Sequence, residues 1–162
     1  MPLSVDPDRQ LLELFGRIPL FACLDDAGLK ELLHFARDFD VTSGTCFFRQ
    51  GDAPEGLYVV WRGDVEVSIR GSGSGRKVVL ARLSNGSIFG EMSLIDDEAR
   101  SATALVHERC KLFEISRRDL EDLLFVDRDL AYELLWNFVR TLSRRLRGMN
   151  DKMTFLATTN KF

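Results

Sequence analysis

Residues 57 to 70 decide the fold, and they read Leu-Tyr-Val-Val-Trp-Arg-Gly-Asp-Val-Glu-Val-Ser-Ile-Arg. Val65, Val67 and Ile69 alternate with polar residues, which is the pattern of a half-buried strand. The run from Leu57 to Trp61 is β-branched and aromatic, and a glycine separates it from the alternating run. The stretch therefore predicts two β-strands.

The period of two continues on both sides of this stretch. Further β-type runs occupy residues 78–80, 102–106 and 111–115, and glycines punctuate the sequence between the runs. Short strands separated by glycine turns predict a jelly-roll-like β-barrel of about eight strands between residues 39 and 115. The expected fold class is α+β, mainly β.

Helical spacing replaces the period of two at both ends of the chain. Residues 7–15 and 26–36 are predicted to be amphipathic helices, and Asp25 or Asp26 is the expected N-cap of the second. Ser116 followed by Asp119 resembles a capping box that begins a further helix.

A long helix is predicted from about residue 128 to residue 156. Its apolar residues repeat as an a/d pattern over about three heptads, formed by Leu135, Val139, Leu142, Leu146, Met149, Met153 and Leu156. We expect this helix to form a parallel homodimer or to dock on a partner protein. The predicted division is a ligand-binding unit at residues 1–126 and the long helix, a lid and possible dimerisation element, at residues 127–162.

Composition argues against several classes of function. The 162 residues carry a net charge of −3, whereas domains that bind nucleic acid are usually basic. The sequence has neither a signal peptide nor an apolar run long enough to span a membrane, so we expect a cytoplasmic protein. Its two histidines are scattered, and no nucleophile-and-base set is visible. We expect no metal, no cofactor and no enzymatic activity.

Residues 89–103 carry the candidate chemistry, and they read Phe-Gly-Glu-Met-Ser-Leu-Ile-Asp-Asp-Glu-Ala-Arg-Ser-Ala-Thr. Gly90 permits a sharp turn and a close approach of the backbone to a ligand. A helical turn over Glu91 to Leu94 would direct free N–H groups at an anion. Arg100 can bind a phosphate by two parallel hydrogen bonds.

The neighbours of Arg100 add to this pocket. Ser101 contributes a hydroxyl group, and Ala102 contributes a backbone N–H without side-chain bulk. Glu91 would repel a phosphate, so its carboxylate suits a neutral donor such as a sugar hydroxyl. The alternative is an ordinary hairpin in which Glu91 and Arg100 form an ion pair.

The segment resembles the phosphate-binding cassette of cyclic nucleotide-binding domains, position by position and including the gap between Glu91 and Arg100. This family includes the effector domain of the bacterial catabolite activator and domains of cyclic-nucleotide-regulated kinases and channels. The resemblance extends from about Leu11 to Ala157, through Ile18-Pro19-Leu20-Phe21 and Gln50-Gly51-Asp52. It implies a sensor, here without the DNA-binding domain of the activator.

The resemblance implies a role for each matching residue. Glu91 would accept a hydrogen bond from the ribose 2′-hydroxyl, and Arg100 would pair with the cyclic phosphate. Backbone contacts and the Ser101 side chain would complete the site, together with a base contact from the long helix. The ligand-binding residues implied in this way are Gly90, Glu91, Met92, Ser93, Arg100, Ser101, Ala102 and Asn150.

The identity of the base is predicted from two positions. In this family threonine next to the arginine often accompanies cGMP, and serine occurs in cAMP binders, so Ser101 favours cAMP over cGMP. Asn150 would contact the adenine edge, and Met149 would pack on its face or lie in a coiled-coil core.

The expected function is a regulatory sensor that changes conformation on binding a cyclic purine nucleotide and controls a partner. The alternatives are an interaction module that binds no nucleotide and works through the long helix, a sensor for another nucleotide such as cyclic di-GMP, and a degraded transcription factor whose basic helix reaches DNA.

Overall fold

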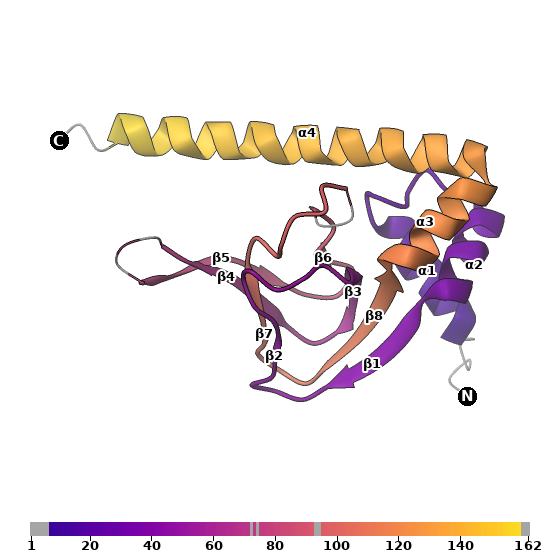
Figure 1. Ribbon diagram of the computed structural model, residues 1–162, viewed down its shortest axis with the longest axis horizontal. Coiled ribbons are helices and arrows are strands. Elements are labelled where there is room, and N and C mark those ends of the chain that lie inside the picture. Colours follow the sequence, from indigo (N-terminus) through magenta and orange to yellow (C-terminus); the bar gives the residue numbers. More distant parts are fainter. Residues whose placement is uncertain (1–6, 72, 74, 93–94, 160–162) are drawn as a thin grey trace, which may run out of the picture.

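The computed structural model describes residues 7–71, 73, 75–92 and 95–159, and it shows eight strands between two pairs of helices (Figure 1). In chain order the elements are α1 (Pro7–Arg17), α2 (Asp26–Phe35), β1 (Arg37–Val41), β2 (Cys46–Phe48), β3 (Gly56–Arg62), β4 (Val65–Arg70), β5 (Lys77–Leu83), β6 (Ile88–Phe89), β7 (Thr103–Val106), β8 (Cys110–Ser116), α3 (Arg117–Val126) and α4 (Arg128–Thr159).

The strands form two antiparallel four-stranded sheets, with the orders β1-β8-β3-β6 and β2-β7-β4-β5. The prediction of eight strands with helices at both ends is confirmed. The strands form a sandwich, however, and not a closed barrel, because no described strand of one sheet pairs with a strand of the other. Strand β6 is only two residues long, and both residues pair with β3, at Val59 and Tyr58. That edge therefore ends before it reaches the second sheet.

Strand β3 is buried on both faces, and its alternate side chains enter two separate cores. Leu57 and Val59 pack with the helices, whereas Tyr58 and Val60 pack between the two sheets. Strand β8 divides in the same way. Burial on both faces explains why β3 reads as a continuous apolar run. The alternation of β4 does not separate a buried face from an exposed one, because Glu66 and Ser68 are buried whereas Val67 and Ile69 are only half-buried.

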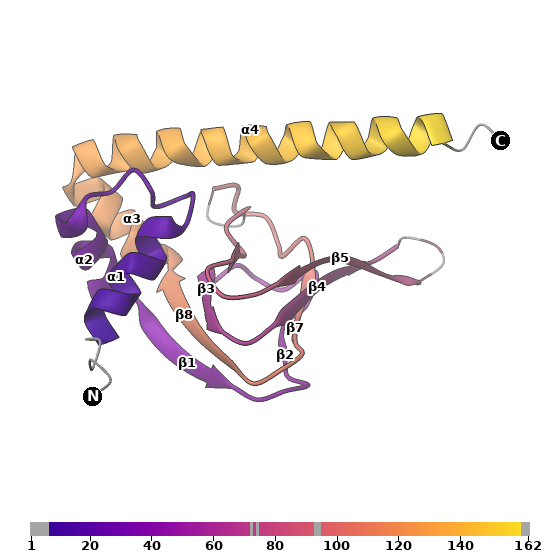
Figure 2. The same cartoon turned by 180° about the vertical axis from the view of Figure 1, so that it is seen from behind.

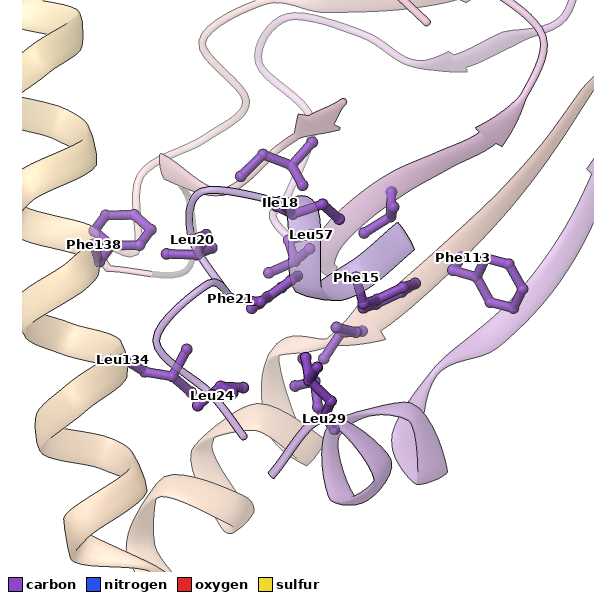
Figure 3. Packing of buried hydrophobic residues seen from close by; sticks show 14 of the residues in the cluster. Phe15, Ile18, Leu20, Phe21, Leu24, Leu29, Leu57, Phe113, Leu134 and Phe138 are labelled. Atoms are coloured by element: carbon purple, nitrogen blue, oxygen red, sulfur yellow. The ribbon is translucent and has the colours of Figure 1, made fainter. Parts of the chain in front are cut away.

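The larger core lies where the helices cover the first sheet. Phe15 of α1 is fully buried, and its ring centroid lies 5.7 Å from that of Phe21 and 6.0 Å from that of Phe113 on β8. Leu134 and Phe138 reach this cluster from α4 (Figure 3). The beginning of α4 is therefore fixed to the body of the domain by apolar contacts.

The predicted helix caps are confirmed. The Asp25 carboxylate accepts a hydrogen bond of 2.8 Å from the Gly28 amide, and Ser116 Oγ accepts one of 3.1 Å from the Asp119 amide. These side chains satisfy backbone N–H groups that have no partner within the helix. The residue order alone was enough to locate both helix starts.

Helix α4 continues well past the part that packs on the core. Every described side chain from Ser143 to Thr159 is exposed. Figures 1 and 2 show this half of the helix passing over the β4–β5 hairpin. No helix in the described part of the chain is long and apolar enough to cross a membrane.

We predict that Phe15→Ala lowers the free energy of unfolding by about 3–5 kcal/mol, because it leaves a cavity between two aromatic rings. Phe125→Ala is the matched control, since Phe125 is 81% exposed, and its cost should stay within about 0.5 kcal/mol. Urea unfolding followed by circular dichroism measures both. Equal effects of the two substitutions would contradict this assignment of the core.

Candidate functional site

The segment between β6 and β7 leaves the first sheet, reaches toward α4, and returns to the second sheet (Figures 1 and 2). The Ile95 amide donates to the Met92 carbonyl at 3.1 Å. The helical turn expected over Glu91 to Leu94 stays a prediction. Two of its positions, Ser93 and Leu94, lie outside the described residues.

Arg100 is the buried cation of this segment, with 3% of its surface exposed. Its Nη1 atom donates to the Gly90 carbonyl at 3.0 Å, and Nη2 donates to the Gly56 carbonyl at 2.9 Å. The Arg100 Nε is buried and has no hydrogen-bond partner among the described residues. Two neutral carbonyls therefore hold the guanidinium through two of its five N–H groups, and Nε is its one nitrogen without a partner among the described residues.

Aromatic rings cover the guanidinium. The Arg100 Cζ lies 4.4 Å from the ring centroid of Phe48 and 5.4 Å from that of Tyr58. The Tyr58 hydroxyl donates to Glu114 at 3.0 Å, and burial, followed by the charge of Glu114, raises the pKa of Tyr58. The phenol stays neutral, and its face stabilises the buried cation.

The backbone of Arg100 is fixed to the turn at residues 50–52. The Arg100 amide donates to the Asp52 carbonyl at 2.8 Å, and the Gly51 amide donates to the Arg100 carbonyl at 2.8 Å. The Gln50 amide donates to Thr103 Oγ1 at 3.0 Å. This turn, which the sequence analysis noted only as part of the family framework, therefore positions the arginine.

Glu91 is buried, with 6% of its surface exposed, and its carboxylate forms an ion pair with Arg145 of α4. The alternative hairpin with a Glu91–Arg100 pair is therefore wrong. Burial lowers the pKa of the Arg145 guanidinium, which nevertheless remains protonated at neutral pH. The sequence analysis did not single out Arg145, because no local pattern distinguishes it from Arg144 or Arg147.

Arg100, Glu91 and Arg145 line a cavity of about 380 Å³, a size typical of small-molecule sites. Its apolar wall comes from the β4–β5 hairpin and β6, and its polar groups come from the cassette and α4. The lining residues are Phe48, Val67, Leu80, Ala81, Leu83, Ile88, Phe89, Gly90, Glu91, Met92, Arg100, Ser101, Ala102 and Arg145. Arg100 and Phe48 also border a second cavity, on the side of Tyr58 and Glu114.

The structure brings together most of the predicted site residues. Six of them line the cavity, namely Gly90, Glu91, Met92, Arg100, Ser101 and Ala102. Ser93 lies outside the described residues, and Asn150 is exposed on α4 away from the residues that line the cavity. Met149 is likewise 60% exposed. From the long helix, Arg145 lines the cavity.

A family model described as the cyclic nucleotide-binding domain matches residues 39–127, which is more than half of the chain. The chain belongs to the cyclic nucleotide-binding domain family. The cyclic AMP receptor protein of Thermus thermophilus is 37% identical over 114 residues, which cover 70% of this chain and 50% of that protein. The chain spans half or less of the length of the first curated relatives that it matches.

Solved structures agree with this assignment. The N-terminal domain of a transcriptional regulator from Streptomyces coelicolor has a TM-score of 0.72 and 36% identity, over 86% of this chain and 94% of that one. The regulatory domain of Toxoplasma gondii PKA, crystallised with cAMP, has a TM-score of 0.67 and 28% identity, over 72% and 45% of the two chains. The chain is thus a cyclic nucleotide-binding domain related to cAMP sensors.

This cyclic nucleotide-binding domain offers no arrangement of metal ligands in its described part. The sequence analysis treated its two histidines as isolated, but His107 Nε2 lies 3.0 Å from Glu66 Oε2. Lys77 also contacts this buried carboxylate, and its hydrogen bond lowers the pKa of Glu66. Among the described residues, no group of three or more His, Cys, Asp or Glu side chains could hold a metal ion.

Gly90 is needed for the position of Arg100. Its φ is +77°, and a Cβ atom at this residue would lie 2.5 Å from Arg100 Nη1 and 3.2 Å from the Gly56 carbonyl oxygen. Gly44 has a similar φ of +83° with nothing within 4 Å of such a Cβ. An alanine at either position would have a strained left-handed backbone, but only an alanine at residue 90 would also meet Arg100. A comparison of the two substitutions therefore measures the cost of that contact.

We predict that Gly90→Ala costs roughly 1–3 kcal/mol more unfolding free energy than Gly44→Ala, because only the first substitution displaces a packed side chain. Each alanine carries the same cost of a left-handed backbone. Denaturant unfolding measures both variants. If both substitutions lower the free energy of unfolding by the same amount, the close approach of Arg100 to Gly90 does not contribute to stability.

Proposed function

We propose that this domain binds cAMP in the cavity between the cassette and α4 and acts as a regulatory sensor. The observation that carries the proposal is that Arg100 and Glu91, a buried cation and a buried carboxylate, line the same cavity. A cyclic nucleotide offers a matching pair of groups, an anionic phosphate and a neutral ribose hydroxyl.

The buried guanidinium suits the phosphate. Two N–H groups of Arg100 donate to neutral carbonyls, and its Nε has no hydrogen-bond partner among the described residues. Hydrogen bonds to a charged acceptor are roughly twice as strong as those to a neutral one, so a phosphate oxygen would compete well for the guanidinium. Backbone groups of Gly90, Met92, Ser93 and Ala102 would surround the ribose and phosphate.

The preference for cAMP rests on Ser101 and on the relatives. Ser101 lines the cavity, and in the family a threonine at this position often accompanies cGMP. The Thermus relative is named a cyclic AMP receptor protein, and the Toxoplasma regulatory domain was solved with cAMP. Asn150 and Met149 could reach the base only if the exposed half of α4 closes on the cavity, and we assign that contact to the ligand-bound state.

Binding would be converted into a signal by a two-state shift. The cassette contacts α4 directly, so a change at the ligand alters the helix and through it a partner. In this proposal the domain is a sensor and not an enzyme, it needs no nucleic acid, and it works in the cytoplasm, where its free thiols of Cys23, Cys46 and Cys110 stay reduced.

The partner that the surface favours is a second copy of this chain. The heptad residues Leu135, Val139, Leu146, Met149 and Met153 are 47–67% exposed, and they follow one stripe of α4. A straight stripe with a/d spacing matches an identical stripe on another helix. In the alternative function, an interaction module that binds no nucleotide, the same stripe of α4 would bind the partner.

We predict saturable binding of cAMP at one site per chain, with cGMP binding more weakly. Arg100→Ala should weaken binding by about 2–5 kcal/mol, since it removes the partner of the phosphate. Glu91→Ala should cost about 1.5–3 kcal/mol, the scale of a charged hydrogen bond. Calorimetric titration measures both, after absorbance and extraction show that no nucleotide has co-purified.

Arg109→Ala is the control for these titrations, because Arg109 is exposed, pairs with Asp40 at 3.5 Å and does not line the cavity. Circular dichroism must show that each variant is folded. If Arg100→Ala and Glu91→Ala are folded and bind as tightly as the parent, the proposed site is wrong. An empty, folded parent that binds neither nucleotide would favour the interaction module.

We predict that the chain is a dimer in solution and that Leu146→Glu makes it monomeric, because a charge would then lie in the apolar seam. Phe155→Glu is the matched control, since Phe155 is 66% exposed on the same helix but lies outside the a/d stripe. Size-exclusion chromatography with light scattering distinguishes the states. A parent that remains monomeric would overturn the prediction, as would equal effects of the two variants.

A further inference from the structure

The tip of the cassette contains a strained backbone residue. Asp97 has a φ of +59°, and every other residue with a positive φ in the described part of the chain is a glycine. Aspartate visits this left-handed region more readily than most residues, but glycine would adopt it without steric cost. The strain at residue 97 therefore indicates that its side chain has a function, and the contacts of the carboxylate show which one.

The Asp97 carboxylate ties the cassette tip to helix α3. It forms an ion pair with Nη1 of Arg117, the first residue of that helix. The Arg117 side chain is half-buried, and its Nε donates to Glu121 at 2.7 Å. Ile95 borders a small hollow of about 60 Å³ together with Arg117, but Ile95 is 53% exposed. The apolar contact of the tip with α3 is thus incomplete, and the ion pair gives the tip a defined position.

Arg117 is also connected to the phosphate-binding arginine through β3. The Arg117 amide donates to the Glu55 carbonyl at 2.9 Å, and the next carbonyl, that of Gly56, accepts a hydrogen bond of 2.9 Å from Arg100 Nη2. Asp97 precedes Arg100 by only three residues. Contacts from the backbone and from the side chain of Arg117 therefore lead to the two ends of the same arginine.

We propose that Arg117 is a positioning residue of the cyclic nucleotide site: its ion pair with Asp97 holds the cassette tip against α3 and thereby keeps Arg100 in the place where it binds the phosphate. This inference rests on the proposed function. Neither Arg117 nor Asp97 lines the ligand cavity, so both residues act through Arg100 and make no contact with the ligand themselves.

The position of Arg117 argues against a role in the stability of α3. It lies in the first turn of the helix, where the positive end of the helix dipole disfavours a cation. The cap of this helix is formed by Ser116 and Asp119 and does not use the Arg117 side chain. A neutral residue at position 117 should therefore leave the domain as stable as before, and loss of the contact with the cassette should appear in ligand affinity instead.

The test compares Arg117→Gln with Arg118→Gln in the full chain. Arg118 is the next residue of α3, is exposed and forms no ion pair with any described residue, so each variant removes one positive charge from the first turn. Calorimetry should show that Arg117→Gln binds cAMP about two- to fivefold more weakly than the parent, the range of an exposed ion pair. Arg118→Gln should bind like the parent, and all three proteins should unfold at the same urea concentration.

Asp97→Asn tests the other side of the pair. Asparagine also accepts the left-handed backbone but carries no charge, so this variant should weaken cAMP binding by about the same factor as Arg117→Gln. General attraction predicts the opposite sign, since loss of a negative charge would favour an anionic ligand. The double variant should bind no more weakly than either single variant, because the pair can be broken only once.

Three results would overturn the proposal: Arg117→Gln binds like Arg118→Gln, it loses affinity only together with stability, or the effects of the two single substitutions multiply in the double variant. A further measurement needs no ligand. Hydrogen exchange of residues 95–100 should be faster in Arg117→Gln and Asp97→Asn than in the parent and Arg118→Gln, and unchanged exchange overturns the proposal. If the folded, nucleotide-free parent does not bind cAMP, the proposed function fails, and the exchange measurement alone decides whether Arg117 positions the cassette.

Discussion

The site depends on one buried guanidinium, that of Arg100, which must be satisfied without an anion of the protein. The structure meets this requirement with the carbonyls of Gly90 and Gly56 and with the faces of Phe48 and Tyr58. These groups come from β2, β3 and the end of β6, so the cation fixes the place where both sheets meet the cassette. The glycine at residue 90 follows from this arrangement, because a Cβ atom there would meet Arg100 Nη1.

The two halves of α4 have different roles because they are held by different interactions. Apolar contacts of Leu130, Leu134 and Phe138 fix the first half to the helical core, and such contacts do not respond to a small charged ligand. The second half continues the same helix and contacts the cassette through the ion pair of Glu91 and Arg145. The first half thus anchors α4 on the domain, and the second half brings α4 to the ligand cavity.

Sequence patterns were enough for the strands, the helix caps and most of the cassette, because local spacing controls these features. They could not show that the strands form a sandwich, since closure depends on how far short edges such as β6 reach. They did not show which residue of the long helix meets the cassette. Arg145 was not singled out, although the structure turns it onto Glu91, and the base contact of the exposed Asn150 stays a prediction. Which face of a helix meets a site depends on its tertiary packing angle, and a heptad pattern does not contain that angle.

The charges that line the cavity also constrain the ligand. Arg100 and Arg145 contribute two positive charges, and Glu91 contributes one negative charge, although the whole chain has a net charge of −3. The cavity is therefore locally cationic by one unit, which matches the single charge of a cyclic phosphodiester. The match holds only while Arg145 stays paired with Glu91 at the cavity wall. A linear phosphate monoester carries more negative charge than this cavity balances, so the lining charges favour a cyclic phosphodiester over a linear phosphate.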